Sequence, residues 1–185
     1  ATGLVNGGAD LIIIETAQDI LEVKAAIFGA RAAFEETGKK LPIQISVSLL
    51  PNGGKMLLGT DISAVLTTLE ALKVDVIGLN CSTGPEDMRD AIRYLGENAT
   101  TPVHCIPNAG LPLQGPDGET IFPEKPEPLA ASLGEFVERF GVGIVGGCCG
   151  TTPEHIKAIA DRVRDLKPRP RPGKGDELLL SSMMT

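Results

Sequence analysis

The chain has 185 residues, of which 42% are hydrophobic, and a formal net charge of -7. This length is typical of one domain that buries a hydrophobic core. The excess of acidic residues argues against nucleic acid or an anionic membrane as a main partner. No apolar run reaches the roughly 20 residues of a membrane-spanning helix, and the first residues lack the basic start and apolar stretch of a signal peptide. We therefore expect a cytoplasmic chain that binds neither nucleic acid nor membrane.

Five short segments predict parallel β-strands. They are rich in Val and Ile and almost continuously apolar, which is typical of parallel strands covered on both faces. The expected strands span 10–15, 43–49, 74–80, 102–107 and 143–147. Each is followed by a segment with apolar residues at helical spacing. The expected helices span 19–36, 62–73, 85–97, 128–140 and 153–166.

Five consecutive βα units predict an α/β fold, either a TIM (β/α)8 barrel or an open doubly wound sheet. No G-x-G-x-x-G motif follows a strand, so the dinucleotide-binding version is weakly supported. A complete barrel needs eight units and about 250 residues. In a barrel, residues 1–167 would hold only about the last five units. Residues 168–185, rich in Pro and Gly, are expected to be an interdomain linker, with a frayed terminus as the alternative.

Three of the four cysteines are expected at one edge of the sheet. Cys81 follows the third strand, and Cys148 and Cys149 follow the fifth. The carboxyl ends of parallel strands form the edge that carries active sites in such folds. Cys105 lies inside a strand and is expected to be an inert buried thiol. So few cysteines in a chain of this length argue against a disulfide framework.

Three convergent thiolates with one open position are the pattern of a catalytic zinc site. His104, inside a strand, and His155, expected to face solvent from the first turn of a helix, are poor candidates for a fourth ligand. Consecutive strand residues point to opposite faces, so we expect the flanking glycines to bend the backbone until both adjacent cysteines converge. These glycines are Gly146, Gly147 and Gly150. A redox pair of Cys148 and Cys149 is the alternative.

Two helices are expected to begin just after the cysteines. Thr151 or Thr152 is the predicted N-cap of the last helix, and Ser82 or Thr83 that of the helix after Cys81. The positive ends of both helices would then offset part of the thiolate charge.

Three more polar residues stand at strand ends. Glu15 follows the first strand, Asn80 ends the third, and Asn108 follows the fourth in "PNAGLP" (107–112). Glu15 is either a ligand-binding carboxylate or an ordinary surface charge. Asn108 is either a site residue or a turn residue.

The segments "GLNCSTGPEDM" (78–88), "PNAGLP" (107–112) and "GGCCGTTPEHI" (146–156) together resemble the homocysteine S-methyltransferase superfamily, in particular the homocysteine-binding domain of its cobalamin-dependent methionine synthases. The resemblance covers nearly the whole chain. It implies a TIM barrel in which Cys81, Cys148 and Cys149 bind zinc. Asn108 matches the side chain that occupies the open zinc position until substrate displaces it.

The resemblance also implies that Glu15 binds the amino group of homocysteine and that Asn80 is the polar residue beside the first ligand. The first barrel strands of the family, with their substrate-binding Asp-Gly-Ala-Met-Gly-Thr-like motif, have no counterpart here. We therefore expect the isolated segment to be inactive, with exposed edge strands at 10–15 and 143–147.

The activity that the resemblance implies is methyl transfer to homocysteine, bound and activated as a zinc thiolate, giving methionine. Methylcobalamin is the favoured donor, with betaine or S-methylmethionine as alternatives. Cobalamin would belong to the full-length enzyme and would not be bound by this segment. The expected partners are the methylcobalamin-carrying and methyltetrahydrofolate domains of the same polypeptide. A non-catalytic redox or structural dicysteine fragment remains the alternative from a different class.

Overall fold

The computed structural model describes residues 1–51, 54–173, 175 and 179–182. One sheet holds five parallel strands in the order β1-β2-β3-β4-β7. The strands are β1 (Ile12–Ala17), β2 (Ile43–Val47), β3 (Val76–Asn80), β4 (Val103–Ile106) and β7 (Ile144–Val145). Neighbours in the sheet follow one another along the chain, as in a barrel, whereas a doubly wound sheet reverses its order at a switch point. The topology therefore favours the barrel, with β1 and β7 as its two edge strands.

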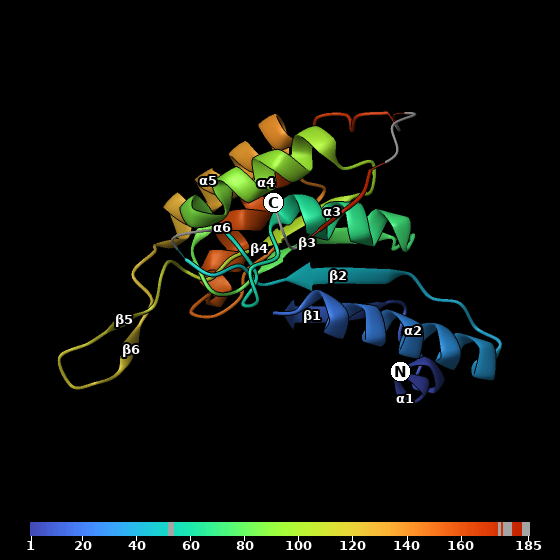
Figure 1. Cartoon of the computed structure of the whole chain (residues 1–185). Coiled ribbons are helices and arrows are strands. Elements are labelled where there is room, and N and C mark those ends of the chain that lie inside the picture. Colours follow the sequence, from blue (N-terminus) through green and yellow to red (C-terminus); the bar gives the residue numbers. More distant parts are fainter. Residues whose placement is uncertain (52–53, 174, 176–178, 183–185) are drawn as a thin grey trace.

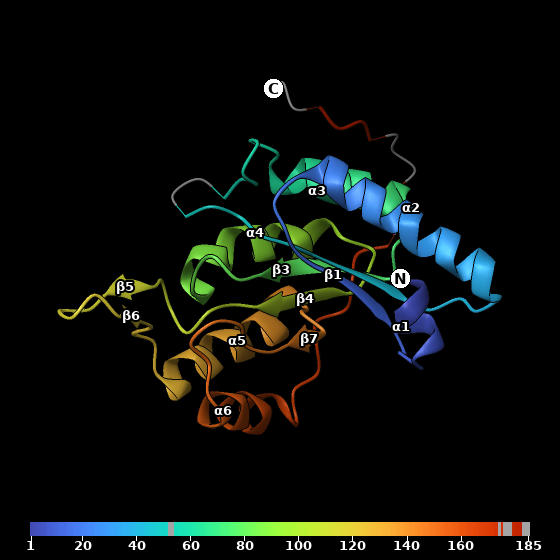
Figure 2. The same cartoon turned by 90° about the horizontal axis from the view of Figure 1, so that it is seen from below.

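The helices form a layer that follows the strand order. They are α2 (Ile20–Thr37), α3 (Ile62–Ala71), α4 (Pro85–Asn98), α5 (Pro126–Phe140) and α6 (Pro153–Val163). α3 packs on α4, α4 on α5, and α5 on α6, and Figures 1 and 2 show the helices succeeding one another around the sheet. The five predicted strands and five predicted helices are confirmed, with bounds that differ by a few residues.

Two features were not predicted. A short helix, α1 (Thr2–Asn6), precedes β1 and packs on α2. A hairpin of β5 (Leu113–Gln114) and β6 (Thr120–Ile121) projects away from the body in Figure 1. Its two-residue strands are too short to show a period in the sequence. None of the helices formed by the described residues has the length and apolar character required to cross a membrane.

The two faces of the sheet carry different side chains. On β2, Ile43, Ile45 and Val47 belong to the hydrophobic core, whereas Gln44 and Ser46 alternate with them. All five are buried. The expectation that both faces are covered is confirmed for this strand, but the face opposite the core is polar. This polar face leads toward the cysteines at the carboxyl ends of the strands.

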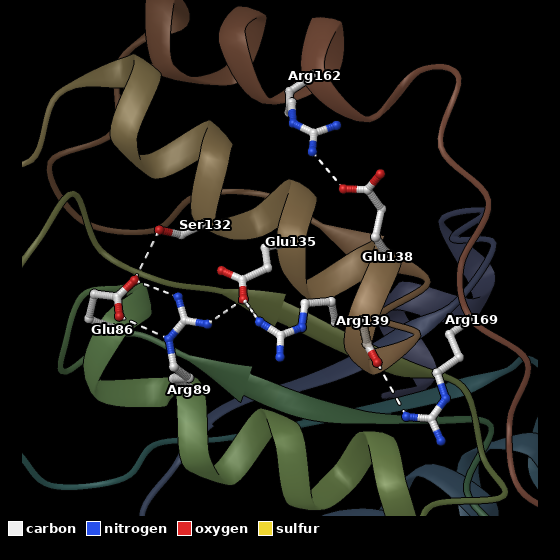
Figure 3. Close-up of polar contacts among 8 residues, drawn as sticks. All are labelled: Glu86, Arg89, Ser132, Glu135, Glu138, Arg139, Arg162 and Arg169. Atoms are coloured by element: carbon white, nitrogen blue, oxygen red, sulfur yellow. Dashed lines mark hydrogen bonds and ion pairs between the residues drawn. The ribbon is translucent and has the colours of Figure 1, made fainter.

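The contact between α4 and α5 has an apolar centre with charged residues at its rim. Arg89 Nη1 lies 3.0 Å from Glu135, and its Nη2 lies 2.8 Å from Glu86 (Figure 3). The guanidinium also lies 5.1 Å from the centre of the Phe136 ring. Hydrogen bonding to Arg89 lowers the pKa of Glu86. Partly exposed ion pairs of this kind add little stability, so burial of the Phe136 ring contributes most of the stability of this contact.

The segment 168–185 contains no helix or strand within residues 168–173, 175 and 179–182, the part that the structure describes. Residues 174, 176–178 and 183–185 lie outside the described residues. The backbone N–H of Arg169 donates to the carbonyl of Val137 at 3.3 Å, so the start of the segment packs back on α5. Its role as an interdomain linker stays a prediction.

Asp61, the N-cap of α3, predicts a pH-dependent contribution to stability. Its Oδ1 accepts hydrogen bonds from the Ser63 hydroxyl at 2.6 Å and the Ala64 N–H at 2.9 Å, and these bonds lower its pKa below the ordinary value of 3.8. We expect Asp61→Ala to reduce the free energy of unfolding by about 1 kcal/mol near neutral pH. Because the folded-state pKa is depressed, this stabilisation is present above pH 3.8 and is lost as the pH falls through the folded-state pKa.

Urea denaturation over a range of pH measures the difference. Asp61→Asn is the matched control, because asparagine also caps helices but does not titrate. It should keep most of the stability near neutral pH and lose none of it on acidification. A loss in Asp61→Ala that is equal at every pH would contradict the role of the carboxylate.

Candidate metal centre

The three cysteines at the carboxyl edge of the sheet converge on one point. The Sγ atoms of Cys81 and Cys149 lie 3.7 Å apart, and those of Cys148 and Cys149 lie 3.9 Å apart. All three sulfur atoms lie within 4.8 Å of one another. A tetrahedral zinc ion with Zn–S bonds of about 2.3 Å separates its sulfur ligands by about 3.8 Å. The donor set therefore fits zinc in number, chemistry and spacing, and all three cysteines are free thiols.

Cys81 reaches this point through a left-handed backbone. Cys81 has φ 60° and Ser82 has φ 63°. Non-glycine residues rarely adopt this conformation, and it is concentrated at functional sites. The Cys81 N–H donates to the Ile106 carbonyl at 3.2 Å, which holds the turn against the end of β4. The turn directs the Cys81 side chain toward the loop that carries the other two cysteines.

The three glycines around the adjacent cysteines do not share one role. Gly150 has φ 77°, so the expected need for backbone freedom is confirmed there. Gly146 and Gly147 have no positive φ, so a left-handed backbone does not explain glycine at these two positions. A Cβ on Gly147 would lie 2.4 Å from the Thr151 side chain, so this position requires glycine for close packing.

The helix caps near the cysteines are confirmed at one helix and wrong at the other. Thr152 is the N-cap of α6, as predicted. The N-cap of α4 is Gly84, with no side-chain capping bond, in place of Ser82 or Thr83. Ser82 is in the left-handed conformation, and its hydroxyl instead lies 2.5 Å from that of Ser48. Both helices still begin within a few residues of a cysteine, so their positive ends lie near the sulfur cluster.

His155 is buried, so the expectation that it faces solvent is wrong. Its Nδ1 accepts from the Thr152 N–H at 3.2 Å as part of a capping box. Its Nε2 lies 3.1 Å from the Glu124 carbonyl, to which it donates. The ring therefore ties the start of α6 to the segment that follows the hairpin.

The remaining histidine and cysteine are confirmed as buried strand residues. His104 is fully buried on β4, and burial lowers its pKa to about 4. Cys105 is also fully buried, and burial raises the pKa of its thiol. Cys105 is therefore an inert core residue, as expected.

In the cluster itself, desolvation and the two neighbouring thiols raise the pKa of Cys149 to about 11.

The structure brings two of the other predicted residues to the cysteines. Asn108 is buried, and its Oδ1 accepts from the Cys149 N–H at 3.1 Å. Asn80 is buried, and its Nδ2 lies 3.9 Å from Cys148 Sγ. Glu15 is exposed on the edge strand β1, two strands away from β3. No contact described by the structure joins the Glu15 side chain to the cysteines, and the roles of all three residues stay predictions.

The loop after β4 fastens both cysteine segments through its backbone. The Cys148 N–H donates to the Pro107 carbonyl at 2.8 Å, and the Ala109 N–H donates to the Cys149 carbonyl at 2.9 Å. The Asn108 N–H donates to the Thr83 carbonyl at 3.0 Å. "PNAGLP" is therefore more than a turn, because it sets the distance between the two cysteine loops.

Sequence reasoning assigned no role to two polar residues at this edge. Ser46 and Thr16 both hydrogen-bond the Asn80 side chain. Their signal in the sequence is weak, because a hydroxyl side chain in or beside a strand has many ordinary roles. The polar residues that alternate with isoleucine in β2 were the available hint.

Comparison with known proteins supports the fold and identifies a family. A family model described as Homocysteine S-methyltransferase matches residues 1–163. The chain is 45% identical to methionine synthase of Mycobacterium tuberculosis over 185 residues, covering 100% of this chain and 15% of that protein. It is 46% identical to methionine synthase of Mycobacterium leprae over 163 residues, covering 88% of this chain and 13% of that protein. The chain thus spans a small part of these relatives.

Among solved structures, the apo form of the homocysteine methyltransferase MmuM from Escherichia coli matches with a TM-score of 0.65 and 24% identity, over 86% of this chain and 51% of that one. Coverage of about half of a TIM barrel confirms the expected fold class, a (β/α)8 barrel present in part. At this identity the likeness shows the fold alone. The family match over residues 1–163 shows more: the chain belongs to the homocysteine S-methyltransferase family.

Proposed function

We propose that this chain supplies the zinc-binding and homocysteine-binding part of an enzyme that transfers a methyl group to homocysteine and forms methionine. The observation that carries the proposal is the convergence of three sulfur atoms, 3.7 and 3.9 Å apart for two of the pairs, in a member of this family. This donor set suits a zinc ion that keeps one position for substrate.

Each predicted site residue has a distinct role in the proposal. Cys81, Cys148 and Cys149 would hold zinc, which supplies a way to bind the homocysteine thiol as a nucleophilic thiolate near neutral pH. Asn108 would occupy the fourth coordination position until substrate displaces it. Its amide oxygen accepts a hydrogen bond from the Cys149 N–H and keeps a second lone pair for this purpose. Glu15 would pair with the substrate ammonium group.

The surrounding backbone favours negative charge at this centre. The N-termini of α4 and α6 follow the two cysteine loops closely, starting at Pro85 and Pro153. Their partial positive charge would offset part of the charge of clustered thiolates. Asn80 and Asn108, both buried beside the cysteines, add amide dipoles without adding charge. The chain's own residues would thus bind and orient the substrate sulfur without a titrating side chain as a base.

We propose methylcobalamin as the donor, because the cysteine and "PNAGLP" motifs resemble those of cobalamin-dependent methionine synthases, and the relatives that are 45% and 46% identical are named methionine synthases. The same polypeptide would carry the methylcobalamin and methyltetrahydrofolate domains, since this chain spans only 13–15% of those relatives. We propose a cytoplasmic setting for this enzyme. Betaine and S-methylmethionine are the competing donors, and methionine formation from each donor in turn separates them.

Zinc K-edge absorption on the intact natural polypeptide that carries these residues tests the proposal. We expect three sulfur atoms and one lighter atom around zinc, becoming four sulfur atoms when homocysteine is added. Methionine is the matched control, because a thioether should leave the spectrum unchanged. Bound zinc that does not respond to homocysteine would contradict substrate activation, and absence of zinc would favour the redox interpretation of Cys148 and Cys149.

A further inference from the structure

A chain of buried hydrogen bonds runs across the polar face of the sheet toward the cysteines. His104 on β4 and Ser46 on β2 are both fully buried. His104 Nε2 lies 2.8 Å from Ser46 Oγ, and Ser46 Oγ lies 2.6 Å from Asn80 Oδ1. The imidazole fits because residue 78 is glycine, where a Cβ would lie 2.6 Å from the His104 ring. Three neighbouring strands thus join in one polar chain.

The direction of each hydrogen bond follows from the donors available. Asn80 Oδ1 accepts from the Thr16 N–H at 3.0 Å, and Asn80 Nδ2 donates to the Thr16 hydroxyl at 2.8 Å. The oxygen of the Asn80 amide is thereby identified, and the Ser46 hydroxyl must donate its single proton to it. Ser46 Oγ can then only accept from His104, so the proton of the neutral imidazole is on Nε2.

The neutral form of His104 agrees with its surroundings. Burial lowers its pKa to about 4. Its Nδ1 is buried without a hydrogen-bond partner among the residues that the structure describes. A proton on Nδ1 would leave a buried N–H without an acceptor, so a neutral imidazole with its proton on Nε2, donated to Ser46, fits this site.

The end of this chain lies at a predicted zinc ligand. With its oxygen held by Ser46 and Thr16, Asn80 presents its amide N–H group toward Cys148 Sγ at 3.9 Å. A rotated amide would bring its oxygen to the sulfur and place its nitrogen against the Thr16 N–H, which would then lack an acceptor. Donors outside the ligand shell orient metal ligands, and losing one typically costs 10–100-fold in metal affinity or activity.

We propose that Ser46 and His104 are positioning residues for the Cys148 sulfur. They hold the Asn80 amide so that its N–H group faces that sulfur, and they thereby raise the affinity of the three-cysteine centre for zinc. This inference rests on the proposed zinc function and deepens it. No hydrogen bond described by the structure joins Ser46 or His104 to a cysteine sulfur, so their effect reaches the centre through Asn80.

The test measures zinc affinity and the electronic spectrum of the cobalt(II)-substituted centre in the intact natural polypeptide. A chromophoric chelator competes for zinc, and the sulfur-to-cobalt charge-transfer bands report the state of the thiolates. We expect Ser46→Ala to weaken zinc binding about tenfold and to shift these bands. His104→Leu should act in the same direction, whereas His104→Gln, which keeps a donor near the Nε2 position, should restore both readouts.

Ile45→Val is the matched control, because Ile45 is a fully buried β2 neighbour on the opposite, core-facing side. It should lower stability while leaving zinc affinity and the cobalt spectrum of the folded protein unchanged. Unchanged zinc affinity and spectrum in folded Ser46→Ala would overturn the inference while the proposed function stands. Equal shifts in Ile45→Val and Ser46→Ala would also overturn it. Failure of the unaltered protein to bind zinc would overturn the proposed function and this inference together.

Discussion

Replacing Cys148 by alanine is expected to abolish zinc retention and methyl transfer together. The substitution removes one of three sulfur atoms and leaves Cys81 and Cys149, whose Sγ atoms are 3.7 Å apart, as an incomplete donor set. We expect bound zinc to fall from about one per chain to near zero, and the rate of methionine formation to fall by about 100-fold or more. Metal content after gel filtration and a methyl-transfer assay on the intact natural polypeptide measure the two quantities.

Cys105→Ala is the matched control. It also removes one thiol, but that thiol is fully buried on β4, where its Sγ lies 3.9 Å from the Met88 sulfur. Zinc content and activity should remain, with some loss of thermal stability because a small cavity is left. Full activity in Cys148→Ala would show that the proposed mechanism is wrong. Loss of zinc in both variants would show that the metal depends on folding in general and not on this ligand.

Replacing Phe136 by alanine is expected to reduce the free energy of unfolding by about 3–5 kcal/mol. The ring is fully buried on α5, with its centroid 5.6 Å from that of Phe140 and 5.1 Å from the Arg89 guanidinium. Its removal leaves a cavity between α5 and its neighbours, and the charged pairs at the rim cannot fill it. Chemical denaturation with urea, followed by circular dichroism, measures the change.

Phe28→Ala controls for the loss of an aromatic side chain. Phe28 lies on α2 and is 59% exposed, so its removal should change the free energy of unfolding by no more than about 0.5 kcal/mol. A similar loss in both variants would contradict the assignment of the core to the α4–α5 contact. Zinc bound per folded chain should stay the same in both, because no hydrogen bond described by the structure joins Phe28 or Phe136 to the cysteine loops.

Local patterns explain why the elements could be predicted. The apolar runs of the strands and the helical spacing of residues such as Ile20 and Ile27 reflect burial against one core, which the chain must satisfy segment by segment. The cap of the last helix was narrowed to Thr151 or Thr152 because a threonine just before Pro153 is a local signal, and Thr152 is the residue that caps it. The prediction of Ser82 or Thr83 as the cap of α4 was wrong. The left-handed turn at Cys81 and Ser82 precedes the helix, which begins only at Pro85, with Gly84 as its N-cap.

Burial of single polar residues was not predictable in the same way. His155 lies in the first turn of a helix and was expected to face solvent, yet it is buried, and the Glu124 carbonyl after the hairpin accepts a hydrogen bond from its Nε2–H. The hairpin itself gave no periodic signal. The burial of His155 depends on a segment about 30 residues away in the chain, which no local window contains.

The placement of Cys81, Cys148 and Cys149 at one edge of the sheet could be predicted from the sequence alone, because all three follow parallel strands. The zinc-ligand spacing of their sulfur atoms could not be predicted, since it depends on the left-handed turn at Cys81 and on the backbone hydrogen bonds of the 107–109 loop. Nor could the hydrogen bonds that link His104 to Ser46 and Ser46 to Asn80. Those bonds join three strands, and hydrogen-bond partners across a sheet are set by register and burial, not by spacing along the chain.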